Sequence, residues 1–491
     1  MKIIYRFRNR CKEWCLENKK QFLFLLTIYL LAFTSIIRAN VAYVDDIGRT
    51  YAGYHGWLDW SRYGTEALAT LVHAGWHLTD ISPLPQIIAC IIMAVGGILL
   101  AEIFKGENKI GLWSILAVSM TALGPYFLGM ISYKFDSPYM ALSFLISILP
   151  FCFRRESKKV FAGISVICLL MMCMTYQASS GIYPLIAVFL ALESIIKGEK
   201  VKKVIGFLGI SAVCYLVSLG VFWIFLMREN GVTMFSAAQV IPNAVRKYAV
   251  FYEAIYHDFA KPWLVLLVFL ILFFLLYVYK TTEINKVVGI LLGIVTVIIG
   301  SVFCFGAFLF ISREAYDTRV MYGFNILLAL LAVFISYNAK CWFPKMACAG
   351  LVWSFFVFSL TYGNALVQQQ RYADYRLDLV AADLNGLEVM RTDEVKEIQV
   401  VGDIGLSPVI ISMAEDYPIL NRMDYTRAGE ELIIPGFGEG IWGEYRLLHY
   451  LKIPNIKGTS KDYAPLDMPV IKDTMYHTIR GEENCIVIEL R

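Results

Sequence analysis

The sequence has little excess of either charge, no cysteine pair with the CxxC spacing and few histidines. The formal net charge of the 491 residues is +4, so the composition gives no support for a nucleic-acid partner. The 11 cysteines lie mostly within apolar runs and none forms a CxxC pair, which indicates small buried side chains rather than a disulfide framework. His55 and His73 have no further metal-type ligand at a diagnostic spacing. We therefore expect neither a metal nor a cofactor.

Apolar residues, by contrast, are abundant. Hydrophobic residues make up 58% of the chain and the mean hydropathy is +0.60, which is more apolar than a soluble domain of this length could bury. This composition predicts a membrane protein whose partner is the lipid bilayer. Runs that could span a bilayer fall at 21–37, 84–104, 110–131, 137–153, 160–175, 179–196, 204–226, 263–279, 287–311, 320–337 and 346–363. They predict an all-α polytopic fold of about eleven transmembrane helices.

The distribution of Lys and Arg predicts how the chain is oriented in the plasma membrane. Residues 1–20 are rich in basic residues, and the apolar run that follows lacks a small-x-small cleavage pattern, so we expect a retained signal anchor with a cytoplasmic N-terminus. The basic runs RRESKK and KGEKVKK then fall in cytoplasmic connections, while the alternate connections hold fewer basic residues. An odd number of spans places residues 366–491 outside, after a transmembrane module at 21–365.

Residues 366–491 have the composition and alternation of a small α/β domain. A charged helix-like stretch, QQQRYADYRLDLVAADLNGLEVM, is followed by the strand-like EIQVVGD and the helix-like SPVIISMAED. The segments MYHTIR and CIVIEL flank GEEN and predict a terminal hairpin. The long external connection at 38–83 contains Leu68, Leu71, Val72 and Trp76 at helical spacing, which is typical of a helix lying along the membrane surface.

Charged and polar residues gather at the external ends of the predicted spans. Such residues are costly beside a membrane unless they bind a ligand or one another. They occur in four connections: Asp45, Asp46 and Arg49 after the first span, Tyr133, Lys134 and Asp136 before the fourth, Gln177 before the sixth, and Arg313 and Arg319 before the tenth. Trp57 lies in the first of these connections, among several other aromatic residues.

Carboxylates and arginines on one face suit the transfer of a sugar from a lipid phosphate. The attacking hydroxyl needs a base, and the departing phosphate needs fixed positive charge that guanidinium groups provide in bidentate form. We predict Asp45 as the base, with Asp46 orienting it or hydrogen-bonding the acceptor. Arg313 and Arg319 are the first candidates for the donor phosphate and Arg49 and Lys134 the second. The sugar or acceptor is assigned to Asp136, Tyr133, Gln177 and Trp57.

Each of these features also has a purely structural interpretation. An acidic pair after a transmembrane helix is often a solvated helix end, and Arg313 and Asp317 are at the i, i+4 spacing of a local ion pair. Lys134 and Asp136 could pair across a tight turn, and Gln177 could join two helices by a hydrogen bond. The aromatic residues near Trp57 are typical of an interfacial belt.

The motifs around these residues resemble those of a known family. The segment DDIGRTYAGYHGWLDWSRYGTEAL resembles the first external loop of the type II Gtr glucosyltransferases, polytopic bacterial membrane enzymes whose opening has the form DDxxR…G…W…GR. In this chain the last element reads Ser61-Arg62-Tyr63-Gly64, with Arg and Gly in a different order. YKFDSPYMALS, TYQASSGIYP and REAYDTRVMYGFNILLAL also look like later loop-and-span boundaries of that family.

The resemblance implies a C-type glycosyltransferase (GT-C) architecture. It also implies an acidic base in the first external loop, a polyprenyl-phosphate-linked sugar as donor, and a surface polysaccharide or its lipid-linked precursor as acceptor. Members of the family typically attach glucose, so the expected enzyme is a hexosyltransferase that modifies surface glycans. The alternative is a transporter or flippase for polysaccharide or lipid-linked glycan, which would move its substrate without changing covalent structure.

Overall fold

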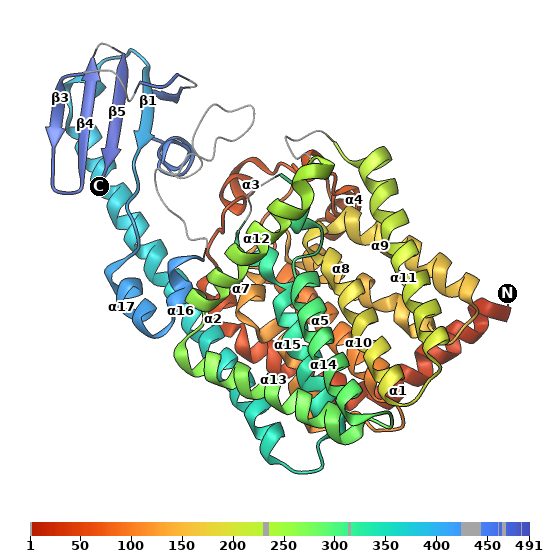
Figure 1. Ribbon diagram of the computed structural model, residues 1–491. Helices are drawn as coiled ribbons and strands as arrows, with labels where there is room; N and C mark the ends of the chain where they lie inside the picture. Colours follow the sequence, from red (N-terminus) through yellow and green to blue (C-terminus); the bar gives the residue numbers. More distant parts are fainter. Residues whose placement is uncertain are drawn as a thin grey trace.

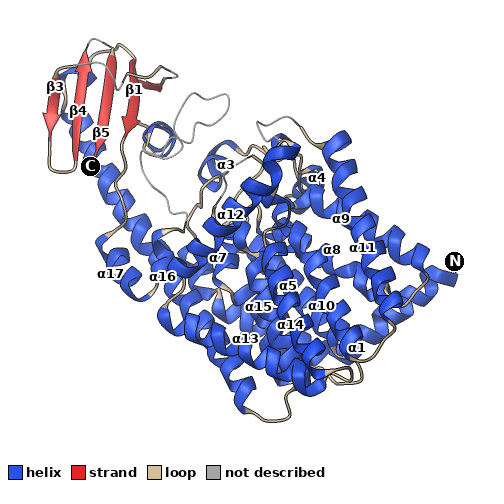
Figure 2. Cartoon of the chain, in the orientation of Figure 1, coloured by secondary structure: helices blue, strands red, loops and turns tan. Residues whose placement is uncertain are grey.

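The computed structural model describes residues 2–228, 235–312, 316–423, 443–459, 461–463, 468–482 and 484–491. Long apolar helices pack side by side in one bundle, and a small sheet lies beyond one end of it (Figures 1 and 2). The bundle helices are α1 (Lys2–Ala32), α2 (Thr34–Ala39), α5 (Leu84–Phe104), α6 (Leu112–Leu123), α7 (Pro125–Ser132), α8 (Ser137–Ile148), α9 (Lys158–Thr175), α10 (Ile182–Ile196), α11 (Val201–Val221), α13 (Lys261–Thr281), α14 (Lys286–Phe303), α15 (Gly323–Asn338) and α16 (Phe343–Gly386).

These helices confirm a multi-pass membrane fold. Within the described residues, eight helices are long and apolar enough to cross a bilayer, and nine if α6 and α7, which meet at a 57° bend, form one span. Of the remaining predicted spans, 21–37 is divided between α1 and α2, and 137–153 corresponds to α8 with the short turn η2 (Leu149–Phe153). The count of about eleven spans therefore stays a prediction.

The core of the bundle lies around α15, whose residues from Gly323 to Ile335 are all buried. By contrast, α11, α13 and α14 expose most of their apolar surface, as expected of helices that face lipid. Close packing also fixes the chain after the first span. A side-chain carbon at Gly363 of α16 would lie 2.3 Å from Ser35 Oγ, so glycine is required for α16 to lie against α2.

Short elements lie at one end of the bundle and form the surface on which the candidate site is built. They are α3 (Asp46–Ala52), η1 (Leu58–Trp60), α4 (Tyr63–Val72), η3 (Gln177–Gly181), η4 (Phe222–Leu226), η5 (Gly306–Leu309) and η6 (Thr318–Met321), and the 22-residue helix α12 (Ala237–Asp258) lies with them. The predicted surface helix corresponds to α4. Leu68 and Val72 pack against buried Trp57, whereas Leu71 is exposed, so α4 has an apolar face toward the protein and another toward its surroundings.

The C-terminal sheet has the strand order β2-β1-β5-β4-β3. The predicted segments EIQVVGD, SPVIISMAED, MYHTIR and CIVIEL correspond to β1 (Lys396–Val401), α17 (Pro408–Asp416), β4 (His477–Glu482) and β5 (Cys485–Leu490), with ends that differ by up to two residues. The structure adds η7 (Glu388–Arg391), η8 (Pro418–Asn421), η9 (Arg446–Tyr450), β2 (Ile456–Gly458) and β3 (Val470–Asp473). β1 pairs in parallel with β2 and β5, while β4 is antiparallel to β3 and β5.

The helical stretch predicted after residue 365 is the second half of α16, which runs for 44 residues without a break. A helix of that length extends about 66 Å, enough to cross a membrane and continue well beyond it. Ala373, Leu377, Val380 and Leu384 line one face of this extension and form a core with Ile398 and Ile486 of the sheet. One helix therefore connects the bundle to the α/β domain.

Candidate functional site

The Asp46 carboxylate ties the first long loop to the turn before α8. Its Oδ2 atom accepts hydrogen bonds from the backbone N–H groups of Lys134, at 2.8 Å, and Tyr43, at 3.3 Å. The side chain is fully buried, and this burial raises the pKa of Asp46 well above its usual range, with the nearby Asp136 adding to the effect. Asp46 is thus placed to fix the position of two loops rather than to face an incoming ligand.

Arg49 and Asp136 form a buried ion pair at the centre of the site. An Arg49 Nη1 proton is donated to Asp136 Oδ2, and both side chains are only 4% exposed. The other carboxylate oxygen of Asp136 accepts from Trp57 Nε1 at 2.5 Å, and the Arg49 guanidinium lies 4.5 Å from the centre of the Trp57 ring. Trp57 is fully buried in this arrangement, so a contact between Trp57 and a sugar stays a prediction that requires the ring to be uncovered.

Lys134 is neutralised in a similar way by a different carboxylate. Its Nζ atom lies 2.8 Å from Asp80 Oδ2, and the Lys134 side chain is 6% exposed. Burial alone would raise the pKa of Asp80, but hydrogen bonds from Lys134 and Ser82 outweigh it and hold the pKa below the usual range. The sequence alternative of a Lys134–Asp136 pair is not what the structure shows, since each of these residues has another partner.

Asp45 differs from the two buried carboxylates because it reaches the surface of the site. Its side chain is 34% exposed, and its Oδ2 atom lies 3.8 Å from Arg49 Nη2, one turn further along α3. Arg49 is already bound to Asp136, so the second contact leaves Asp45 open to solvent on its other side. Of Asp45, Asp46 and Asp136, Asp45 is the carboxylate that an incoming hydroxyl can reach.

Arg319 approaches the same cluster from η6. Its guanidinium donates a hydrogen bond to the Tyr133 hydroxyl and lies 4.9 Å from the centre of that ring. Asp317 Oδ2 is 3.6 Å from Arg319 Nη2, and the Arg319 side chain is 23% exposed. Tyr133 is fully buried, so its hydroxyl orients Arg319 from the interior of the protein. Arg313, the other predicted phosphate ligand, lies outside the described residues.

Arg62 also belongs to this cluster, although the sequence analysis assigned it no role. Its Nε atom lies 3.5 Å from Gln177 Oε1, and Gln177 Nε2 donates to the carbonyl of Trp60 at 2.9 Å. Burial lowers the pKa of Arg62, while Tyr176 and the carboxylate of Asp136, 3.9 Å away, act in the opposite direction. The family pattern ends in GR, whereas this chain reads SRYG, so the pattern did not assign a role to Arg62.

A cavity of about 110 Å³ opens beside Arg62. Two residues with guanidinium groups, Arg62 and Arg228, lie on its polar side. The backbone N–H of Arg228 donates a hydrogen bond to Ser61 Oγ at 2.8 Å. The other walls are largely apolar and come from the ends of spanning helices and the turns next to them. They consist of Phe222, Met227, Phe308 and Ile311. The lining also includes the carboxylate of Asp59, so the cavity joins two cations and one carboxylate to an apolar surface.

The C-terminal region contacts the same end of the bundle. The Tyr445 hydroxyl donates to the carbonyl of Gly48 at 3.3 Å, and the Tyr450 hydroxyl donates to the carbonyl of Ile47 at 2.8 Å. The His449 ring lies 4.3 Å from that of Tyr51. These contacts place the segment after residue 442 directly on α3, which begins at Asp46. Within the described part of the chain, no cluster of three His, Cys, Asp or Glu side chains is arranged to hold a metal ion.

Together these features define a multi-pass membrane protein whose loop carboxylates and arginines converge at one end of a helical bundle. A family model described as "Glucosyl transferase GtrII" matches residues 34–335, a span that includes all of the predicted site residues. The chain therefore belongs to the GtrII glucosyltransferase family. It is also 26% identical, over 162 residues, to a protein of Salmonella phage P22 described as an uncharacterized 55.3 kDa protein in the gtrB 5′ region. That alignment covers 33% of each chain.

Proposed function

We propose that this protein transfers a sugar, glucose by family membership, from a polyprenyl phosphate to a surface polysaccharide or its lipid-linked precursor. Family membership supports the glycosyl transfer, and the helical bundle supports a reaction at a membrane. A membrane-borne donor suits a site on the external face, where nucleotide sugars are absent. The N-terminus would then be cytoplasmic and the α/β domain external, in keeping with the distribution of Lys and Arg.

The cavity beside Arg62 supports a lipid phosphate as donor. An amphiphile of this kind needs cations for its phosphate and an apolar surface for the first units of its chain, and the cavity offers both. Arg62 and Arg319 are the better candidates for the phosphate, because Arg49 and Lys134 are held in buried ion pairs. Arg313 remains a further candidate from the same connection as Arg319. Gln177 lines the cavity and is placed to contact the sugar.

The observation that supports the proposed mechanism is the position of Asp45, an accessible carboxylate 3.8 Å from Arg49 and close enough to Arg62 to influence its charge. Asp45 accepts the proton of the acceptor hydroxyl, whose oxygen attacks the anomeric carbon of the donor sugar. The bond from that carbon to the phosphate oxygen breaks, and its electron pair leaves with the polyprenyl phosphate, which Arg62 and Arg319 stabilise. Direct displacement of this kind inverts the anomeric configuration. Asp46 and Asp136 position the loops that present Asp45 and Arg49.

The experiment that tests this proposal compares the surface glycans of cells carrying the wild-type protein, a deletion and the Asp45→Asn variant at matched membrane levels. We expect the deletion and the variant to lose the same hexose substituent, detected by mass and linkage analysis. A variant that keeps the substituent would show that Asp45 is not the base. Unchanged covalent composition in all strains, together with altered glycan export, would show that the protein is a transporter.

A further inference from the structure

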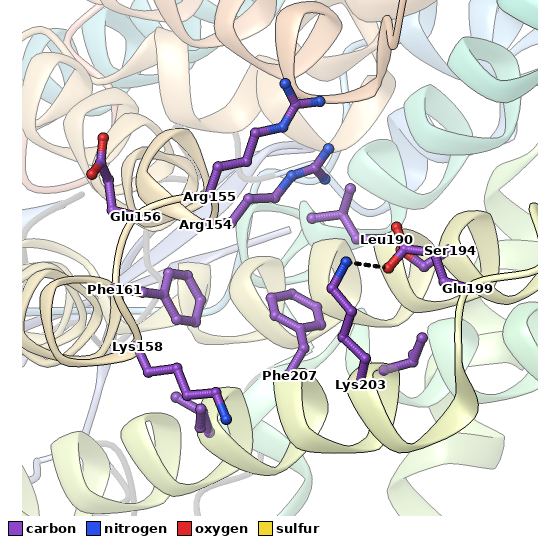
Figure 3. Close-up of a pocket in the computed structure, with 12 residues that line it drawn as sticks. Arg154, Arg155, Glu156, Lys158, Phe161, Leu190, Ser194, Glu199, Lys203 and Phe207 are labelled. Carbon is purple, nitrogen blue, oxygen red and sulfur yellow. Dashed lines mark hydrogen bonds and ion pairs between the residues drawn. The ribbon is translucent and has the colours of Figure 1, made fainter.

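A second and larger cavity lies at the other end of the bundle. It has a volume of about 550 Å³ and is formed by the turn before α9, the end of α10 and the beginning of α11 (Figure 3). Helix α9 connects the two regions, since Lys158 at its start lines this cavity and Gln177, just after its end, lines the cavity beside Arg62. The 18 residues of α9 extend about 27 Å, close to the thickness of a bilayer core. The two cavities therefore lie at opposite ends of one candidate membrane span.

The rim of this second cavity has an excess of positive charge. Arg154, Arg155, Lys158 and Lys203 contribute cations, and Glu156 and Glu199 contribute carboxylates. Lys203 is paired with Glu199 at 2.7 Å, as the dashed line in Figure 3 shows. The two arginines extend from the same turn on one side of the cavity.

Of the cations that line the cavity, Arg154 has the environment that most favours a bound anion. It is partly buried, and this burial lowers the pKa of its guanidinium. The nearby carboxylates of Glu193 and Glu199 oppose that effect from a distance, but Glu193 binds Lys197 at 2.6 Å and Glu199 binds Lys203. Among the described residues, neither of these carboxylates forms an ion pair with Arg154. A phosphate beside Arg154 and Arg155 would supply the missing partner in bidentate form.

The floor of the cavity is apolar, and α11, which forms one of its walls, also exposes apolar side chains. Phe161 and Phe207 lie with their ring centres 5.7 Å apart, and Leu190 is buried beside them. On α11, Val201 and Ile205 are 57% and 63% exposed, as expected of lipid-facing positions. A ligand with a phosphate head and hydrocarbon chains therefore fits both the charged rim and the apolar floor, and its chains can extend along the exposed apolar side chains of α11.

We propose that this cavity binds the phosphate headgroup of an anionic membrane phospholipid, with Arg154 and Arg155 on the phosphate and its acyl chains against the apolar floor and α11. The site is separate from the proposed transfer reaction and does not depend on it. Because it lies at the predicted cytoplasmic end of α9, it would anchor that end of the bundle to the leaflet whose lipids the basic runs already attract.

The test uses the detergent-solubilised full-length protein with dioleoylphosphatidylglycerol as probe and dioleoylphosphatidylcholine as the neutral comparison. Bound lipid is counted by native mass spectrometry, and stabilisation is followed by thermal unfolding. We expect the wild type to retain phosphatidylglycerol at least tenfold better than phosphatidylcholine. The variant Arg154→Gln/Arg155→Gln should lose that preference. Lys200→Gln/Lys202→Gln, which removes two exposed cations of the same region that do not line the cavity, should keep it.

Three outcomes would overturn the proposal. A wild-type protein with no preference between the two lipids excludes an anionic lipid site without reference to any variant. Equal losses in the arginine and lysine variants mean that lipid responds to overall charge and not to the cavity. Inorganic phosphate that stabilises the protein as much as phosphatidylglycerol does identifies a site for free anions. The variant Arg154→Lys/Arg155→Lys serves as a control in case the glutamine variant unfolds. It keeps the charge and should retain part of the preference.

Discussion

Asp45 and Asp136 both contact Arg49, but the structure predicts different consequences when each loses its charge. Asp136 and Arg49 are each 4% exposed and are joined by a direct hydrogen bond. Asp45 is 34% exposed and lies 3.8 Å from the same guanidinium. We therefore predict that Asp136→Asn acts chiefly on stability, whereas Asp45→Asn acts chiefly on catalysis.

The magnitudes follow from burial. Removing one member of a buried ion pair leaves an uncompensated charge and costs about 3–5 kcal/mol. Asp136→Asn should approach the lower limit, about 3 kcal/mol, because the amide oxygen still accepts a hydrogen bond and Asp45 supplies part of the lost charge. An exposed pair contributes about 0–1 kcal/mol, so Asp45→Asn should leave stability almost unchanged. Loss of a general base should lower the transfer rate by about 10²–10⁴-fold.

The assay measures both quantities on the same purified preparations. Thermal unfolding in detergent gives the change in stability, and transfer of labelled glucose from a polyprenyl-phosphate donor to a glycan acceptor gives the rate. Measurements are made well below the unfolding temperature of the weaker variant. Asp393→Asn is a useful control, since Asp393 is exposed and lies outside the proposed site.

Two results would refute this reasoning. A rate for Asp45→Asn within a factor of about three of the wild type would exclude Asp45 as the base, since such a loss is far below that expected of general-base removal. Equal destabilisation by the two substitutions would mean that Arg49 depends on both carboxylates alike. The buried Arg49–Asp136 pair would then not be the element that holds this site in place.

Three further predictions concern other contacts. Asp46→Asn should fold and transfer within about tenfold of the wild type, because an amide oxygen can still accept the hydrogen bonds from the backbone N–H groups of Lys134 and Tyr43. Burial raises the pKa of Asp46, so its contribution to stability is present at low pH and is lost as pH rises above about 4. The variant should therefore gain stability relative to the wild type as pH rises in thermal scans, and equal pH profiles would contradict this. Arg319→Lys should lower transfer about tenfold or more despite the kept charge, and full activity at equal protein level would exclude bidentate binding. Asp258→Asn should cost about 2 kcal/mol in thermal unfolding, because buried Asp258 binds Arg422 Nε at 2.7 Å, and no change would exclude this contact as an anchor of the C-terminal region.

Long apolar runs and alternating strands could be predicted well from the sequence. The run at 84–104 coincides with α5, and the terminal hairpin coincides with β4 and β5, because both patterns reflect burial that extends over many residues. The strands β2 and β3 were not predicted. β2 is only three residues long, and all four residues of β3 are exposed, so neither carries the hydrophobic alternation on which a strand prediction depends.

The gathering of the site residues could also be predicted, because charged residues at the ends of membrane spans are costly unless they bind one another or a ligand. What could not be predicted is which charge pairs with which. Lys134 binds Asp80, 54 residues away in sequence, rather than Asp136 two residues further on, and Arg49 binds Asp136 across 87 residues. Such pairings depend on how loops from different spans fold over one another, and no local spacing encodes that. Arg62 was assigned no role for a different reason, because its motif SRYG departs from the order of the family pattern.

The C-terminal region is held at the site by contacts on both sides of the segment 424–442. On one side, Arg422 binds Asp258 at the end of α12, and Tyr126 of α7 donates to the other oxygen of the same carboxylate at 2.9 Å. On the other side, Tyr445 and Tyr450 donate to backbone carbonyls of α3. The contacts on α3 lie within one turn of Asp46, the residue next to the proposed base. In the proposed reaction, an acceptor at Asp45 would therefore lie close to Tyr445 and Tyr450, and we predict that the C-terminal region contributes to acceptor selection.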